Sequence, residues 1–80
     1  MSITSNTVRR LLRIERVLRQ RYGIRRTDMQ MYYCRMKDGS LSVLMYIFSG
    51  EGYKMIQVNT TRPRLGEFLS KLRLHAVQSI

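Results

Sequence analysis

MQMYYCRMKDGSLSVLMYIFSGEGYKMIQV, residues 29–58, is the stretch that decides the fold. It is rich in Tyr, Val, Ile and Met, and its apolar residues follow the extended period of β-strands. Two dipeptides, Asp38-Gly39 and Glu51-Gly52, interrupt it, and both favour tight hairpin turns. The stretch therefore predicts a three-stranded antiparallel meander, with strands at about residues 29–36, 41–49 and 53–58.

Two-residue loops at both turns would set the register of this sheet. The resulting pairs are Tyr32 with Met45, Cys34 with Val43, Ile47 with Ile56 and Met45 with Val58. These residues form a largely aliphatic face, which should hold the helices. The opposite face carries Met29, Tyr53 and six residues that we predict to contact a protein: Met31, Tyr33, Leu44, Tyr46, Phe48 and Met55. A second copy of the chain is one such protein, so we expect a homo-oligomer.

Helical spacing of apolar residues flanks the sheet on both sides. Residues 7–22 show it, with Ser5 and Asn6 as capping residues before them and Gly23 as the permissive residue after them. Residues 62–75 show it again, with Pro63 in the first turn. We predict helices over 7–22 and 62–75, hence an α+β fold of order α-β-β-β-α, with both helices on one face of the meander.

Composition and length are consistent with one small domain over residues 1–80. The hydrophobic fraction of 44% is too high for a disordered basic tail. No apolar run is long enough to span a membrane, and the first residues lack the order of a secretion signal, so we expect a cytoplasmic protein. The single cysteine, Cys34, and the single histidine, His75, form neither an internal disulfide nor a metal framework.

Arginine is concentrated in one part of the chain. Residues 9–26 hold eight arginines and one acid, so they carry +7 of the formal net charge of +10. On a helix most of these arginines form a stripe. One interpretation is that the stripe binds nucleic acid or an acidic protein, and the other is that it is a solvated face that keeps the protein soluble. A membrane surface fits less well, because the segment lacks Trp and Phe. The predicted contact residues are Arg9, Arg10, Arg13, Arg16, Arg21, Arg25 and Arg26.

Glu15 is the one acid in this segment, and helical geometry places it on the apolar side. A carboxylate there is costly unless it is paired. One interpretation is that Glu15 pairs with Arg19 one turn later. The other is that Glu15 is a polar anchor for a partner or for a loop of the same fold.

Residues suited to catalysis are few and scattered. A nucleophile and base pair would need Cys34 and His75 to converge, and His75 lies near the C-terminus. The five acids form no close pair that could divide acid and base roles. Residues 50–54 contain two glycines and a lysine but lack the spacing and the following helix of a phosphate-binding loop. We predict a protein that is not an enzyme, with no cofactor, no metal and no small-molecule substrate.

The order α-β-β-β-α and the length resemble a double-stranded-RNA-binding domain. In that family the second helix opens with a cluster of lysines, whereas residues 61–65 read Thr-Arg-Pro-Arg-Leu. The likeness is therefore one of topology. It belongs with an alternative function, a nucleic-acid-binding module that uses the arginine stripe on DNA or double-stranded RNA.

A second resemblance rests on four short motifs: Arg13-Ile14-Glu15, Tyr22-Gly23-Ile24, Met31-Tyr32-Tyr33-Cys34-Arg35 and Gly52-Tyr53-Lys54. Through them residues 8–72 resemble the small bacterial AraC negative regulators, the ANR family of virulence-gene repressors. The resemblance implies a cytoplasmic protein that binds an AraC-type activator and blocks its dimerisation or DNA binding. Our hypothesis is a small non-enzymatic transcription regulator that acts by protein contact. The charge of +10 fits that role if the target surface is acidic.

Overall fold

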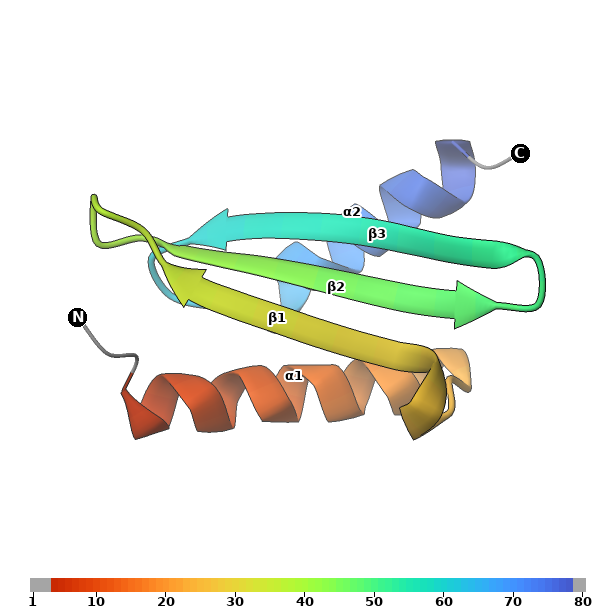
Figure 1. The fold of residues 1–80 in the computed structure, drawn as a ribbon, viewed down its shortest axis with the longest axis horizontal. Coiled ribbons are helices and arrows are strands. Elements are labelled where there is room, and N and C mark those ends of the chain that lie inside the picture. The colour runs from red at the N-terminus through yellow and green to blue at the C-terminus, as the bar shows by residue number, and fades with distance from the viewer. Residues whose placement is uncertain (1–3, 79–80) are drawn as a thin grey trace.

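The computed structural model describes the backbone of residues 4–78 and the side chains of residues 4–73. The elements are α1 (Ser5–Tyr22), a short 3-10 helix η1 (Arg26–Asp28), β1 (Met29–Arg35), β2 (Leu41–Ser49), β3 (Gly52–Thr60) and α2 (Leu65–Gln78). The predicted α-β-β-β-α order and α+β class are confirmed (Figure 1). No helix within residues 4–78 combines the length and the apolar character needed to cross a membrane.

The three strands form one antiparallel sheet in the order β1-β2-β3. Both helices contribute residues to one core on a single face of this sheet. α2 runs behind β3, and α1 runs along the β1 side of the sheet (Figure 1). The core fills the space between the helices and that face of the sheet. Its buried residues are Leu11, Ile14, Leu18, Met29, Leu41, Val43, Met45, Ile56, Val58, Phe68 and Leu72.

α1 begins two residues before the predicted start. The cap is Thr4, whose hydroxyl accepts a hydrogen bond from the backbone N–H of Thr7 at 3.3 Å. The predicted capping residues, Ser5 and Asn6, lie inside the helix instead. The predicted end at Tyr22 is confirmed. Gly23 adopts φ +63° and donates its N–H to the carbonyl of Arg19, which is the usual role of glycine after a helix.

The β1–β2 turn differs from the prediction by one residue. Its loop has three residues, 37–39, because Gly39 donates to the carbonyl of Met36 at 3.0 Å and adopts φ +87°. Met36 in turn donates to the carbonyl of Ser40 at 2.8 Å. This is a type I turn followed by a left-handed glycine, whereas the prediction assumed a two-residue turn of Asp38 and Gly39.

That single residue turns β1 over, so its predicted face is wrong. Met31 lies opposite Met45 and Tyr33 opposite Val43, instead of Tyr32 and Cys34. A shift of one residue exchanges the two faces of a strand. Met29, Met31, Tyr33 and Arg35 therefore face the helices, and Met29 is buried in the core.

The β2–β3 turn lies one residue earlier than the predicted Glu51-Gly52, which shifts the register by two residues and leaves the predicted faces intact. Its loop is Gly50-Glu51, so Ser49 pairs with Gly52 and Met45 pairs with Ile56. The prediction paired Ile47 with Ile56. Because the side-chain period of a strand is two, β2 and β3 keep the predicted residues on the helix side.

α2 covers Leu65–Gln78, so it starts three residues later than predicted and also ends three residues later. Pro63 is buried before the helix rather than in its first turn. Oε1 of Glu67 accepts from the backbone N–H of Arg64 at 3.2 Å and from the hydroxyl of Thr60 at 3.1 Å. These bonds cap the helix and tie the connection between β3 and α2 to its first turn.

Candidate functional surfaces

The sheet face that points away from the helices is an uncharged surface, which we call the open face. In a sheet with this register, alternate residues of each strand point toward it. None of these strand residues is charged, although 25% of the chain is. The open face consists of Gln30, Tyr32, Cys34, Ser42, Leu44, Tyr46, Phe48, Tyr53, Met55, Gln57 and Asn59.

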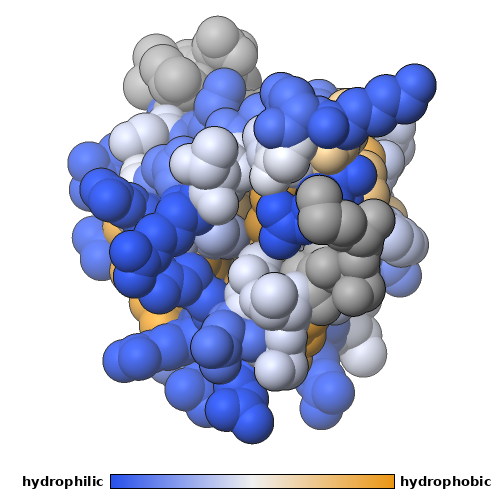
Figure 2. All heavy atoms as spheres, turned by 90° about the vertical axis from the view of Figure 1, so that its left-hand side faces the viewer, coloured by the Kyte–Doolittle hydropathy of each residue, from blue (hydrophilic) through white to orange (hydrophobic). Residues whose placement is uncertain are grey.

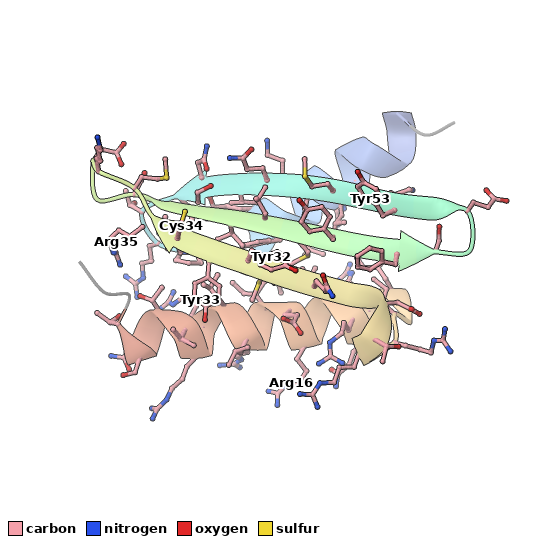
Figure 3. All side chains as sticks on the ribbon, viewed as in Figure 1. Arg16, Tyr32, Tyr33, Cys34, Arg35 and Tyr53 are labelled. Atoms are coloured by element: carbon pink, nitrogen blue, oxygen red, sulfur yellow. The ribbon has the colours of Figure 1, made fainter. Side chains whose placement is uncertain are left out.

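Four aromatic rings form a cluster on the open face around Tyr46. The Tyr46 ring centroid lies 5.8 Å from that of Tyr32 on one side and 5.8 Å from that of Tyr53 on the other. Phe48 lies 6.4 Å from Tyr46 and 6.3 Å from Tyr53. Tyr32 and Tyr53 remain 54% and 64% exposed, and Figure 3 shows both on the open side of the sheet. The rings support one another but are not covered by any described element.

Four of the six predicted interface residues lie on the open face: Leu44, Tyr46, Phe48 and Met55. The other two, Met31 and Tyr33, do not. Met31 packs against the core, and Tyr33 points toward α1 at the edge of the sheet (Figure 3). Tyr32 and Cys34 occupy the open face instead. Sequence reasoning missed them because their place depends on the length of the β1–β2 loop.

The predicted arginine contacts are all on the surface. Arg9, Arg10, Arg13, Arg16 and Arg21 are exposed along α1, and Arg25 and Arg26 are exposed just after it. Nε of Arg25 pairs with Oδ2 of Asp28 at 2.9 Å. Seen from the end of the molecule where α1 begins, hydrophilic side chains cover most of the surface (Figure 2). Because α1 packs on the other face of the sheet, its arginines and the open face are separate surfaces.

Glu15 makes the contact that the first interpretation predicted. Its Oε1 lies 3.5 Å from Nε of Arg19, and the two side chains keep 19% and 22% of their exposure. The pair lies beside a shallow hollow in which Leu12, 53% exposed, is surrounded by arginines. Glu15 thus offsets a guanidinium at the border of the core.

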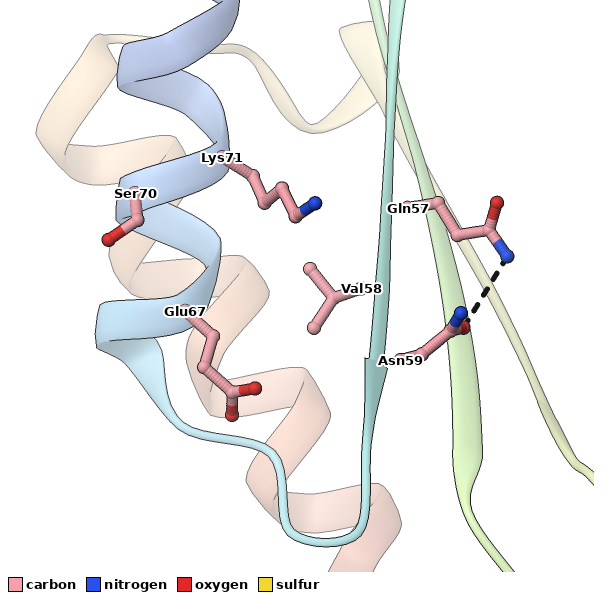
Figure 4. Close-up of a pocket in the computed structure, with 6 residues that line it drawn as sticks. All are labelled: Gln57, Val58, Asn59, Glu67, Ser70 and Lys71. Carbon is pink, nitrogen blue, oxygen red and sulfur yellow. Dashed lines mark hydrogen bonds between the residues drawn. The ribbon is translucent and has the colours of Figure 1, made fainter. Parts of the chain in front are cut away.

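Two hollows lie next to α2. One, of about 600 Å³, spans the edge of β3, but Gln57 and Asn59 point to the open side of the strand while Val58, Glu67 and Lys71 lie on the helix side (Figure 4). It is a strand edge rather than a chamber. The other, of about 310 Å³, lies between α1 and the segment that enters α2 and is lined by Arg10, Arg13, Ile14, Val17, Pro63, Arg64 and Leu65.

Among the described side chains, no group of three or more His, Cys, Asp or Glu residues could hold a metal ion. Cys34 is exposed on the open face. The side chain of His75 lies outside the described residues, so the pair with Cys34 that sequence reasoning considered has no described geometry.

Comparisons with known proteins return nothing: no protein-family model, no curated protein and no solved structure matches the chain. The ANR resemblance therefore stays a prediction from short motifs.

Proposed function

We propose that this chain is a non-enzymatic regulator that works by protein contact, with the open face as its main contact. The observation that carries the proposal is the absence of charge from this face in a chain of net charge +10. An exposed, uncharged cluster of aromatic residues and methionine is typical of protein interfaces. A platform for single-stranded nucleic acid would instead need cations beside the rings to hold the phosphates.

The sequence resemblance adds a class of partner to this proposal. In it the chain is a bacterial, cytoplasmic negative regulator that binds an AraC-type activator of virulence genes. Covering a surface that the activator needs for dimerisation or for DNA would lower transcription. The open face can bury several rings without desolvating a charged group, so such a contact is not opposed by the cost of burying unpaired charge.

The test is an activator-dependent reporter with a matched pair of variants. An AraC-type activator from the organism that encodes this chain drives the reporter, and the chain is co-expressed. Wild type should lower the signal, whereas Tyr53→Lys should restore it, because it places a charge inside the contact. Tyr22→Lys makes the same change on an exposed tyrosine at the end of α1 and should still repress.

Two readouts make this test decisive. Both variants must unfold at the urea concentration of wild type, which excludes loss of fold as the cause. Purified activator should bind wild type and Tyr22→Lys but not Tyr53→Lys in a titration. Equal repression by the two variants would remove the open face from the mechanism.

The arginine surface supports a second candidate function, binding of duplex DNA or RNA. Arg9, Arg13 and Arg16 are exposed on α1, and guanidinium groups contact phosphates readily. Titration with duplex DNA and duplex RNA at about 150 mM salt separates the candidates, because phosphate contacts give a steep salt dependence. The triple substitution of Arg9, Arg13 and Arg16 by Glu should abolish tight binding if this surface contacts the nucleic acid. Loss of repression in the same variant would favour this function over the first.

A further inference from the structure

The 310 Å³ hollow between α1 and α2 is a groove with an apolar floor and a cationic rim. Ile14 and Val17 of α1 form one side of the floor, and Pro63 and Leu65 form the other. Three exposed arginines stand around it: Arg10, Arg13 and Arg64. Aliphatic side chains and guanidinium groups are thus presented together at one place.

Contacts within the fold shape this groove. Arg10 donates from Nη1 to the carbonyl of Pro63 at 3.5 Å and so links α1 to the segment before α2. Ile14 is only 5% exposed, which fixes that side of the floor to the core. On the other side, the bonds of Glu67 to Arg64 and Thr60 hold the connection in place. A preformed site loses little conformational entropy when a ligand binds.

The rim has no acidic partner among the described side chains. The two ion pairs found among the described side chains involve Arg19 and Arg25, neither of which lines the groove. Oε1 of Glu67, the acid nearest in sequence to the rim, accepts from the Arg64 backbone and from Thr60 rather than from a guanidinium. Three arginines around one hollow repel each other, so an anionic group that enters it is favoured.

We infer that this groove binds a short segment of a partner protein in which an apolar side chain is flanked by Asp or Glu residues. The apolar side chain covers the floor, and the carboxylates pair with the rim, where arginine forms bidentate bonds. A phosphate backbone satisfies only the rim, and the floor has no aromatic ring for a base to stack on. The inference rests on the proposed protein-contact function and adds a second contact of stated chemistry.

The probe is a short fluorescein-labelled peptide in which two leucines alternate with pairs of aspartates. Fluorescence anisotropy measures the affinity of the peptide, and salt at about 150 mM screens unspecific electrostatic attraction. Wild type should bind this peptide at least about tenfold more tightly than a version with serine for leucine, since each leucine buries apolar surface. A version with asparagine for aspartate should weaken by a similar factor. Equal binding of the leucine and serine peptides would overturn the inference.

Matched triple variants test the location. The rim triple replaces Arg10, Arg13 and Arg64 by Gln and removes the charge of the rim. The control triple replaces Arg16, Arg21 and Arg26 by Gln and removes the same charge elsewhere. The rim triple should lose at least about tenfold in affinity, and the control triple should change by less than about threefold, as expected for screened long-range attraction. Equal losses would mean general charge attraction and overturn the assignment.

Two further variants separate this inference from its neighbours. Val17→Ser alters the floor without changing charge and should weaken the leucine peptide only, with urea unfolding used to confirm the fold. Tyr53→Lys on the open face should leave peptide binding unchanged. The reporter assay therefore tests the open face and the peptide assay tests the groove, and either can fail without the other. Duplex DNA that displaces the peptide, and whose own binding needs the rim triple, would assign the groove to nucleic acid and overturn the inference.

Discussion

The Nε atom of Arg19 lies 3.5 Å from Oε1 of Glu15, one turn away on α1, and both side chains are mostly buried. This Nε atom has no hydrogen-bond partner and is itself buried. Glu15 is therefore the described group that offsets the charge of Arg19. The pair explains how a carboxylate is tolerated beside the core of a chain so rich in arginine.

Replacing Glu15 by Gln should lower the free energy of unfolding by about 1–2 kcal/mol, a value between those of exposed and fully buried ion pairs. The loss has two sources: the guanidinium of Arg19 loses its partner, and the positive charge of α1 rises. Urea unfolding measures the effect. Glu51→Gln, in the exposed β2–β3 turn, changes the net charge equally and should stay within about 0.5 kcal/mol of wild type. Equal losses would assign the effect to net charge alone.

Gly39, in the β1–β2 turn, should tolerate substitution by alanine worse than Gly50 in the β2–β3 turn. It adopts φ +87°, where a Cβ is strained, whereas Gly50 has no positive φ and open space around it. Gly39→Ala should therefore cost about 1–2 kcal/mol of unfolding free energy. Gly50→Ala is the control and should be close to neutral. The reverse order in urea unfolding would contradict the three-residue turn.

The β1–β2 turn also marks where prediction from sequence stopped. Asp38-Gly39 indicates a hairpin, but the dipeptide suits two kinds of turn. It can form a two-residue loop, or its glycine can take the third position of a three-residue loop. The choice depends on backbone bonds at Met36 and Ser40, which no local pattern specifies. Between β2 and β3 the error was an even number of residues, so the faces survived. Tyr46 and Phe48 were placed correctly for this reason, and Tyr33 was not.

The groove beside Pro63 could not be predicted at all. Its two walls are more than forty residues apart in the chain, and they meet only after α1 and α2 pack on the same sheet face. The sequence did contain a signal, the Arg62-Pro63-Arg64 turn before an apolar stripe. From sequence alone this segment predicts a helix start, because proline is common in a first helical turn.

Asp38 should make the stability of the hairpin depend on pH. Ser40 donates its hydroxyl to Oδ1 at 2.6 Å and its backbone N–H at 2.9 Å, and these bonds hold the pKa of Asp38 below its ordinary value of 3.8. A carboxyl whose pKa is lowered by folding stabilises the fold above its unfolded pKa and loses this effect as the pH falls through the folded pKa.

The corresponding measurement compares wild type with Asp38→Asn across pH. Near neutral pH wild type should be the more stable protein, and the difference should shrink once the pH falls below 3.8. Ser40→Ala removes the hydroxyl bond and should raise the pKa of Asp38 in an NMR titration. A constant difference between the two proteins down to strongly acidic pH would contradict this account.

Cys34 provides a chemical test of the β1 register. It is exposed on the open face of the single chain, so its thiol should react with a disulfide reagent in the native monomer almost as fast as in urea-unfolded protein. The register expected from two-residue turns would place the thiol beneath the helices and make the reaction wait for unfolding. The assay is repeated on Phe48→Lys to exclude protection by a second copy. Slow labelling in both proteins would mean that β1 is the other way round.

Without its partner, the open face should be covered by a second copy of this chain. Two uncharged faces can meet although each chain carries +10, because the charges lie elsewhere, and a small domain gains core area by pairing. We expect sedimentation to show a dimer at tens of micromolar protein. A dissociation constant in this range corresponds to about 6 to 7 kcal/mol of association free energy.

In such a twofold contact each substitution acts twice, since both copies carry it. Phe48→Lys should therefore give a monomer. Leu12→Lys, which changes an exposed apolar residue on α1, should leave the dimer intact. The dimer should also dissociate when the activator is added, since both would use the same face. A dimer that survives Phe48→Lys would place self-association elsewhere on the molecule, whereas a wild-type monomer would reserve the open face for the heterologous partner.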